Sequence, residues 1–364
     1  MNIGFVTTWS RRGTKYQTKF FCDHILNKHR VFYYIYRDVH FENKENQFMH
    51  YSFNRTGKPE KVLNWAKSNN LDMVFFIERQ TDHYLLDQYH AAGIKTATTI
   101  MQENIYPSVS AILKKYSYVI CPVKCTYNVL KENNLDNLVF LKWAVDTKLF
   151  SPVPKDHFET PLTRFIFNAG WGGAHWRKNP LAVVQAFDKA SKDNELIELV
   201  FKTQKPLKEY EPEVRNIIDN NPRINVNQEN LTLDKLIELY KQCHVSLLPS
   251  KWEGIGLPYL ESLAQGLPVI TVDEPPMNEW IVDGENGYCC KIDHIDPRYE
   301  DLPDGSQEIM YTGAVYIDID DFAEKILLLS DKTRQKKMST KAIESVAANE
   351  ETFYLELNRF LNNH

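Results

Sequence analysis

Glu253 and Glu261 stand eight residues apart in the segment SLLPSKWEGIGLPYLESLAQGLPVI. A strand is expected to end at Pro249, the turn Gly254–Gly256 follows Glu253, and a helix then carries Glu261. A loop and one helical turn separate the two carboxylates by roughly 10 Å, which is too far for them to share one proton. The spacing suits the two ends of one elongated ligand, whose anionic middle would meet the amides of the glycine turn and of the helix N-terminus.

The loop FNAGWGGAHWRKNP, ahead of the helical pattern LAVVQAF, also has the features of a ligand site. Arg177 and Lys178 stand where that helix begins, and because the helix dipole disfavours cations there, their placement indicates an anion between them. A nucleotide diphosphate sugar has the matching shape, with a hydroxyl-rich sugar, an anionic diphosphate, and then ribose and base. Glycine is scarce, with 14 residues in 364, yet five lie in these two loops, where they let the backbone approach a ligand: Gly170, Gly172, Gly173, Gly254 and Gly256.

Each feature also has a purely structural interpretation. Plain turns need glycine, an exposed basic pair can simply be solvated, Glu261 fits a solvated helix surface, and Glu253 fits the positive end of a helix dipole. The residues alone leave these alternatives open.

The elements that must position these loops alternate regularly along the chain. Apolar, β-rich runs such as NIGFVTT, HRVFYYIY and LDMVFFI are separated by helical patterns at 15–26, 59–68, 81–92 and 124–132. This alternation predicts a parallel sheet with helices on both faces. In such sheets ligands bind beyond the carboxyl ends of the strands, where both glycine loops are expected.

A break at residues 151–163, with three prolines and no periodicity, indicates an interdomain linker. The alternation then restarts, Thr232 fits a helix N-cap, residues 292–312 read as a long acidic loop, and the last fifty residues are helical. We therefore expect an α/β protein of two doubly wound, Rossmann-like domains. The first spans 1–152 and the second 153–340, and a C-terminal helix at 341–364 packs back towards the first.

Composition excludes several protein classes. With 43% hydrophobic, 12% aromatic and 25% charged residues, the chain is not a disulfide-rich miniprotein, a coiled coil or a disordered protein. No apolar run approaches the ~20 residues that span a bilayer, and MNIGFVTTWSRR is interpreted as a strand, not a signal peptide. The six cysteines lack zinc spacing, so free thiols in a cytoplasmic protein are expected.

The E-x7-E pattern of Glu253 and Glu261 resembles that of the retaining family 4 glycosyltransferases, which have the GT-B fold of two domains facing a central cleft. Further segments in the same order are similar to this family: the FVTTWSRRGTKYQTKFF start, WAVDTKLFSP, RKNPLAVVQAF, GLPVITVD and VDGENGY. The resemblance covers most of the chain and implies transfer of a sugar from a nucleotide diphosphate sugar with retention, in polysaccharide biosynthesis at the cell envelope.

Site roles follow from the resemblance residue by residue. It implies that Glu253 binds hydroxyls of the donor sugar, that Glu261 binds the ribose, and that Lys178 binds the diphosphate. Arg177 is the nearby arginine for the same task, although the family usually places its arginine earlier. The implied backbone contacts to the donor come from Gly13, Gly172, Gly173, Gly254, Ile255, Gly256 and Leu257. The segment TIMQENI departs from the family, because Gln102 and Glu103 stand where many members have a histidine.

No metal is expected to take part. Cations and helix amides can stabilise a leaving diphosphate by themselves, and Asp318 with Asp320, which would form a D-x-D pair, are better interpreted as the start of a helix. A GT-B epimerase acting on a nucleotide sugar is one alternative function, and a non-catalytic binding module is another.

The halves of the chain differ in charge. Residues 1–150 carry 20 Lys and Arg against 13 Asp and Glu, a net +7, whereas the remainder carries −12. With the donor residues in the second half, the first is expected to bind the acceptor, a glycan or a lipid-linked glycan on an anionic membrane. This places the protein in the cytoplasm, peripherally at the inner face of the membrane. A nucleic-acid acceptor is the second choice, and a merely solubilising surface the third. The residues considered are Arg11, Arg12, Lys15, Lys19, Lys114, Lys115, Tyr116 and Tyr118.

Overall fold

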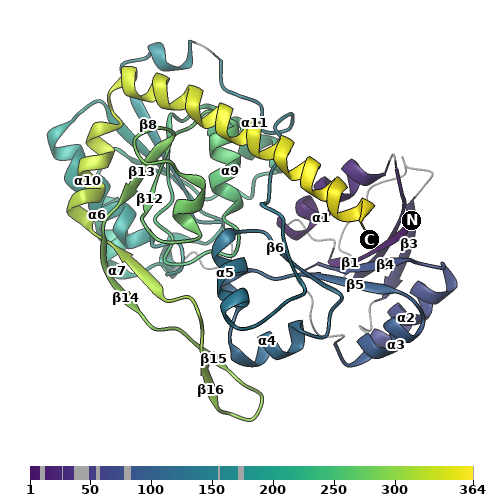
Figure 1. The fold of residues 1–364 in the computed structure, drawn as a ribbon. Coiled ribbons are helices and arrows are strands. Elements are labelled where there is room, and N and C mark those ends of the chain that lie inside the picture. The colour runs from purple at the N-terminus through teal and green to yellow at the C-terminus, as the bar shows by residue number, and fades with distance from the viewer. Residues whose placement is uncertain are drawn as a thin grey trace. The chain divides into compact units, whose positions relative to one another are not determined.

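The computed structural model describes residues 1–8, 13–26, 28–36, 49–54, 58–77, 83–154, 156–170 and 176–363. The chain divides into two compact units (Figure 1). Unit 1 consists of Met1–Trp143, Tyr299–Tyr311 and Phe353–His364, and unit 2 of Ala144–Arg298 and Thr312–Thr352. Each unit has its own parallel sheet.

Unit 1 contains a seven-stranded parallel sheet in the order β3-β2-β1-β4-β5-β6-β7. The order reverses between β1 and β4, which is the mark of a doubly wound sheet. The strands are β1 (Asn2–Thr8), β2 (Arg30–Tyr36), β3 (Met49–Asn54), β4 (Met73–Phe76), β5 (Lys95–Thr99), β6 (Tyr118–Cys121) and β7 (Leu138–Phe140). The helices are α1 (Gly13–Ile25), α2 (Pro59–Ser68), α3 (Leu86–Ala91), α4 (Pro107–Leu113) and α5 (Lys124–Glu132).

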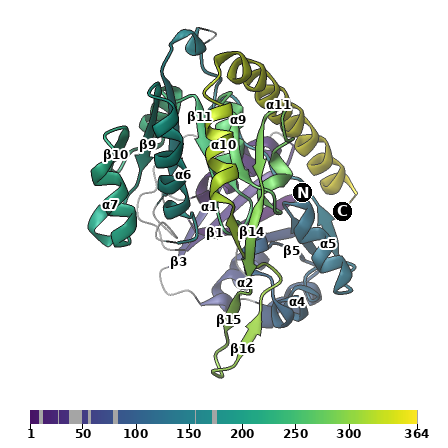
Figure 2. The same ribbon diagram turned by 90° about the vertical axis from the view of Figure 1, so that its left-hand side faces the viewer.

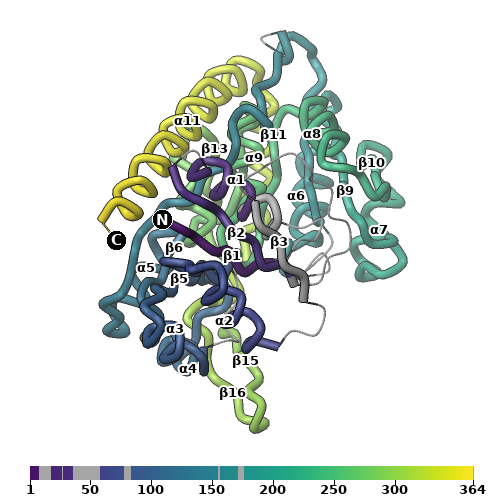
Figure 3. Tube along the Cα trace, turned by 90° about the vertical axis from the view of Figure 1, so that its right-hand side faces the viewer, coloured from purple at the N-terminus to yellow at the C-terminus, as the bar shows by residue number. Residues whose placement is uncertain are grey.

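Unit 2 contains a six-stranded parallel sheet in the order β10-β9-β8-β11-β12-β13. Figures 2 and 3 both show its β10 edge, beside α7. The strands are β8 (Thr163–Asn168), β9 (Ile197–Lys202), β10 (Ile224–Asn227), β11 (Val245–Leu247), β12 (Val269–Val272) and β13 (Gly287–Cys290). The helices are α6 (Pro180–Asp193), α7 (Pro212–Asn220), α8 (Leu233–Lys241), α9 (Leu257–Ala264), α10 (Ile319–Leu328) and α11 (Lys332–Asn362), whose last residues belong to unit 1.

The apolar stripe near the end of α11 completes the core of unit 1. Phe353 is buried against Phe21 and Trp143, with ring centroids 6.1 and 5.5 Å away. Phe360 meets Tyr118 edge to face at 5.1 Å. Since burying a large apolar side chain contributes about 1.5–3 kcal/mol, these residues are a substantial part of the core of unit 1.

The segment expected to be a linker, residues 151–163, lies wholly within unit 2. Val153 and Phe158 are buried in a cluster with Ile166, and the amide of Val153 donates to the carbonyl of Gln265 at 3.0 Å. The first division between the units falls at Trp143 and Ala144. The prolines punctuate a packed irregular segment, and this is why they resembled a linker in the sequence.

The prediction of an acidic loop at 292–312 is wrong. β14 (Ile292–Asp296) pairs antiparallel with β17 (Ala314–Ile317), and between them β15 (Tyr299–Asp301) pairs with β16 (Gln307–Ile309). Most side chains of β14 and β15 are exposed. Strands whose side chains are mostly exposed need no alternation of apolar and polar residues, so β14, β15 and β16 carried no strand pattern, whereas the apolar β17 is largely buried.

Candidate functional site

The candidate site lies at the carboxyl ends of β8 and β11, the neighbouring central strands of unit 2. The strand order reverses between them, which leaves a crevice where ligands bind in open α/β sheets. The loop after β8 leads to Arg177 and Lys178 ahead of α6, and the loop after β11 leads to Glu253 ahead of α9. The fold thus brings together two loops about seventy-five residues apart in the chain.

Glu253 is the centre of the site. Its side chain is buried, with 4% of the residue exposed. Arg177 donates from Nη1 to Oε2 at 2.8 Å, and Lys178 forms an ion pair through Nζ with Oε1. The hydroxyl of Ser250 donates to Oε1 at 2.7 Å. Both carboxylate oxygens are therefore bound: Oε2 by Arg177, and Oε1 by Lys178 and by Ser250 from the other loop.

These contacts determine the charge of Glu253. Burial raises the pKa of this carboxyl, but the charges of Lys178 and Arg177 and the hydrogen bonds from Lys178 and Ser250 outweigh burial and lower the pKa to about 2. Glu253 is therefore an anion at neutral pH. In this structure Glu253 is the anion beside the two cations, and the bound anionic ligand expected from the sequence stays a prediction.

The turn between Glu253 and α9 is fixed by its glycine and by a tryptophan. Gly256 has φ +82°, a conformation that favours glycine, and a Cβ there would lie 2.8 Å from the ring of Tyr259. The indole of Trp280 donates to the carbonyl of Ile255 at 2.7 Å. The backbone from Gly254 to Leu257 therefore enters the helix in one defined conformation.

Glu261 lies on α9, one turn beyond the helix start, and is half-buried. Burial of the carboxyl raises its pKa to about 7, and the charge of Lys178 opposes this rise. Lys178 thus acts electrostatically on both glutamates of the motif. Glu261 changes charge near neutral pH, whereas Glu253 does not.

The structure brings together most of the residues singled out from the sequence. Arg177, Lys178 and Glu253 form one cluster, and Glu261 interacts with Lys178. Gly172 and Gly173 lie outside the described residues. Gly13 begins α1 in unit 1.

Two residues of the site, Ser250 and Trp280, were not predicted from the sequence. Ser250 directly follows Pro249 at the end of the β11 segment and binds Glu253, and Trp280 fixes the turn from a distant segment. No spacing rule singles out either residue. Position at the carboxyl end of a central strand was the one available signal, and it applied to Ser250 only.

The acceptor-side expectations change in one respect. Lys114 and Lys115 are exposed, but Tyr116 is buried in the core of unit 1 and Tyr118 packs on Phe360. Tyr116 therefore forms no surface with the lysines, and Tyr118 is half-buried. Lys19 is paired with Asp23 along α1, and Arg11, Arg12 and the Lys15 side chain lie outside the described part of the chain.

The structure also shows the surroundings of Gln102 and Glu103, which stand in TIMQENI where many members of the resembled family have a histidine. Gln102 is 3% exposed, and its Oε1 accepts a hydrogen bond from the hydroxyl of Thr126 at 2.8 Å. Glu103 is half-buried beside it. A buried amide held by a threonine is consistent with a structural position in unit 1.

In the part of the chain that the structure describes, no three or more His, Cys, Asp or Glu side chains are arranged to hold a metal ion. Asp318 caps α10, its carboxylate accepting from the amide of Asp321 at 2.8 Å. This confirms the interpretation of the D-x-D pair as a helix start. Metal independence of the reaction stays a prediction.

The described ranges contain no helix with both the length and the apolar character that crossing a membrane requires.

Part of unit 2 is similar in sequence to known glycosyltransferases. Residues 171–298 match the model of the family described as glycosyl transferases group 1, a segment that includes Arg177, Lys178 and both glutamates. A curated relative is the UDP-N-acetylglucosamine–peptide N-acetylglucosaminyltransferase GtfA subunit of Streptococcus pneumoniae serotype 4, at 39% identity over 67 residues. That similarity covers 18% of this chain and only 13% of the relative's length.

Solved structures with a similar fold are glycosyltransferases. A glycosyltransferase from Rickettsia africae has a TM-score of 0.74 at 15% identity, over 99% of this chain and 97% of that one. Anabaena HepE in complex with UDP and glucose also has a TM-score of 0.74, at 12% identity over the full length of both chains. The pneumococcal O-GlcNAc transferase GtfA in complex with UDP and GlcNAc has a TM-score of 0.59 at 18% identity, over 83% of this chain and 59% of that one.

These similarities confirm the predicted fold class: the chain has the α/β GT-B fold, with two Rossmann-like units. The match to the group 1 model is confined to residues 171–298, so it is a similarity within unit 2. The identities to solved structures are too low to carry more than the fold.

Proposed function

We propose that this chain is a retaining glycosyltransferase of family 4 that moves a sugar from a UDP-sugar to a glycan acceptor. The observation that carries the proposal is the buried cluster of Arg177, Lys178 and Glu253 at the point where the strand order of unit 2 reverses. UDP is the proposed nucleotide because UDP is bound in the solved structures of HepE and GtfA.

The charge balance of the cluster suits a leaving diphosphate. The cluster places two cations beside one carboxylate. A guanidinium has five N–H donors and an ammonium three, and donors of both kinds suit phosphate oxygens. A diphosphate beside the cluster would gain charge-assisted hydrogen bonds as its negative charge develops, which is the largest single contribution in many transfer reactions.

Glu253 is suited to hold the donor sugar. Because its pKa is about 2, the carboxylate stays an acceptor for sugar hydroxyls at neutral pH. The same two ion pairs make it a weak nucleophile, which favours front-side attack over a covalent intermediate. In that step the acceptor oxygen bonds to the anomeric carbon on the face from which the diphosphate oxygen departs, and the acceptor proton passes to the departing phosphate.

The remaining donor contacts are assigned along the turn and α9. Glu261 would bind the ribose hydroxyls, and the backbone of Gly254, Ile255, Gly256 and Leu257 would face the sugar and diphosphate. The hydrogen bond from Trp280 to Ile255 supports this assignment, because it holds the turn in place before the donor arrives. Gly13, Gly172 and Gly173 stay predicted donor contacts.

The acceptor is proposed to be a glycan. The exposed Lys114 and Lys115 suit a lipid-linked glycan at an anionic surface, and they also suit a nucleic acid. Because Tyr116 is buried, it adds no aromatic ring to that surface, and the proposal of an acceptor at a membrane is weaker for it. Sedimentation with anionic liposomes at low salt, followed by a DNA titration, separates these acceptors.

A UDP-release assay over a panel of UDP-sugars, with and without glycan acceptors, tests the function. We expect acceptor-stimulated UDP release that persists in EDTA, and a product whose anomeric configuration by proton NMR equals that of the donor. Inverted product would refute retention, and activity restored only by Mn²⁺ would refute metal independence. A donor sugar changed in configuration without transfer would identify the epimerase alternative.

A further inference from the structure

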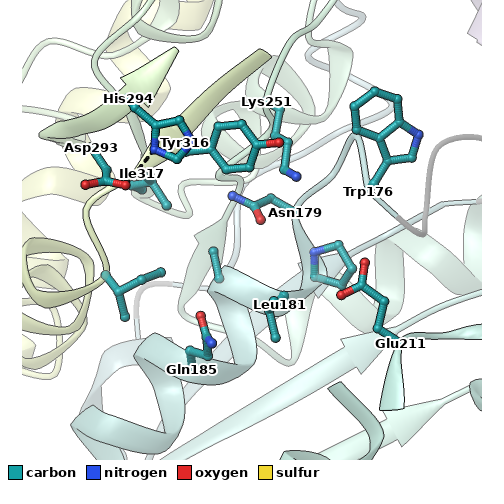
Figure 4. A pocket seen from close by; sticks show the side chains of 13 residues that line it. Trp176, Asn179, Leu181, Gln185, Glu211, Lys251, Asp293, His294, Tyr316 and Ile317 are labelled. Atoms are coloured by element: carbon teal, nitrogen blue, oxygen red, sulfur yellow. Dashed lines mark hydrogen bonds and ion pairs between the residues drawn. The ribbon is translucent and has the colours of Figure 1, made fainter. Parts of the chain in front are cut away.

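Unit 2 contains a cavity of about 230 Å³. It lies between the first turns of α6, the β14–β17 ladder and Lys251 (Figure 4). None of the glutamates of the motif lines it, and neither Arg177 nor Lys178 does. The cavity is therefore lined by a different set of side chains from those of the donor site.

Aromatic rings form two sides of the cavity. Trp176 is 51% exposed, which is unusual for a side chain of that size. Opposite it, the rings of His294 and Tyr316 stack with centroids 4.2 Å apart and an angle of 10° between them. The ammonium of Lys251 lies 4.1 Å from the Tyr316 ring centroid and 5.6 Å from that of Trp176.

A buried amide faces the same space. Asn179 is 6% exposed, and Figure 4 shows it in the middle of the lining residues, close to Tyr316 and Lys251. Its φ is +58°, a left-handed conformation immediately before α6. Its backbone amide donates to the carbonyl of Trp176 at 3.1 Å. Its side-chain amide has no hydrogen-bond partner among the described residues and is not enclosed, so it can bind a ligand or water that enters the cavity.

Charged groups around the rim narrow the class of ligand. Glu211 and Asp293 are exposed at the cavity, and Asp293 bonds to His294 at 2.7 Å. Two carboxylates against Lys251 disfavour a phosphate or a carboxylate ligand. Gln185 adds a second amide to the lining, although it donates to Glu213 at 2.7 Å.

We propose that this cavity binds one neutral sugar ring of a saccharide. The C–H face of a sugar ring packs on aromatic rings, and its hydroxyls both donate and accept, which matches the Asn179 amide and the mixed rim. Cavities for drug-sized ligands measure roughly 300–1,000 Å³, so this one suits a smaller guest of the size of a single ring. The proposal does not rest on the assignment of the donor site.

Saturation-transfer NMR on the full chain tests the proposal, with methyl β-D-glucopyranoside and N-acetylglucosamine as probes and saturating UDP to fill the donor site. We expect at least one sugar to bind in the presence of UDP. Trp176→Ala and Asn179→Gly should each raise its Kd at least tenfold. Glycine is chosen at 179 because it adopts the positive φ without strain.

Tyr299→Ala, a comparably exposed aromatic of unit 1, is the matched control and should leave the Kd unchanged. The Kd for UDP should stay within about twofold in all three variants, which separates this site from the donor site. The proposal is overturned if neither sugar binds once UDP is present, if both cavity variants bind as the parent does, or if uridine displaces the sugar.

Discussion

Arg177 and Glu253, 76 residues apart in the chain, form an ion pair in which the guanidinium Nη1 lies 2.8 Å from Oε2 of the carboxylate. Lys178, the next residue, binds the other carboxylate oxygen. A single glutamate thus neutralises part of the charge proposed to receive the donor diphosphate. In the proposed complex, the diphosphate and Glu253 therefore share the same two cations.

Glu253→Gln is expected to separate binding from turnover. The amide frees both cations for UDP, so the Kd for UDP should stay equal or fall. Turnover should drop about 10²–10³-fold, as for loss of one electrostatic contact in a transition state. Breaking a buried pair costs about 3–5 kcal/mol, so the variant should also melt at a lower temperature and recover more than the parent on adding UDP.

Glu238→Gln on the surface of α8 is the matched control for this variant, since Glu238 is exposed and pairs with Lys241 at 3.3 Å. Its kcat and melting temperature should equal those of the parent. Near-normal turnover in a folded Glu253→Gln protein would show that Glu253 does not have the proposed role in the reaction.

Lys178→Met should have the opposite effect on binding. It keeps the length of the buried side chain but removes the charge, so the Kd for UDP should rise at least tenfold and kcat/KM fall about 10²–10³-fold. Isothermal titration with UDP and initial rates measure the two effects. Lys241→Met, at a half-exposed position on α8, serves as the control, and equal losses in both variants would show that the effect is not specific to the site.

Glu261 should make nucleoside binding depend on pH. Because its pKa is about 7, the carboxylate that would accept from the ribose hydroxyls predominates only above neutral pH. Uridine should therefore bind more tightly at pH 8 than at pH 6, and Glu261→Gln should abolish the difference. Uridine is used because it has no phosphate that titrates in this range, and a pH dependence that survives in Glu261→Gln would contradict the assignment.

His244 should make unit 2 sensitive to acid. It is 2% exposed, and burial, followed by the charges of Lys332 and His157, lowers its pKa to about 3. Between pH 6.5 and 3 the unfolded chain binds a proton that the folded chain does not, so the free energy of unfolding falls as pH falls, by at most about 1.4 kcal/mol per pH unit from this group.

Urea unfolding at several pH values between 5 and 7 measures this slope. His244→Asn keeps an acceptor for the amide of Arg164, which bonds to Nδ1 at 3.0 Å, and should reduce the slope. The control variant His83→Asn in unit 1 should leave the slope unchanged. An unchanged slope in His244→Asn would assign the acid sensitivity to other groups.

The sequence predicted the regular elements well wherever one face is buried. α2 and α5 have the predicted bounds, β1 coincides with NIGFVTT, and Thr232 caps α8, accepting from the amide of Lys235. β14, β15 and β16 were missed because their mostly exposed side chains carry no apolar period, while β17, a short and largely buried apolar run, was not singled out. β3 was missed although MHYSFN alternates apolar and polar residues, the pattern of a half-buried strand.

Within the site, the sequence predicted which residue types matter but not their contacts. The E-x7-E pattern and the basic pair located both loops, and the fold class implied that they meet. That Glu253 itself is the anion of Arg177 and Lys178 depends on the register of β8 against β11, where Phe165 lies opposite Val245. Such a register follows from packing in three dimensions, which no local pattern encodes.

The place of Phe353 and Phe360 in the core of unit 1 has a consequence for biosynthesis. The sheet of unit 1 is translated first, but these core residues follow about two hundred residues later. At 5–20 residues per second the ribosome needs roughly 10–40 s to deliver them. During that time the nascent sheet exposes the apolar surface that α11 will cover, so this protein is expected to engage chaperones on the ribosome and to complete its first unit last.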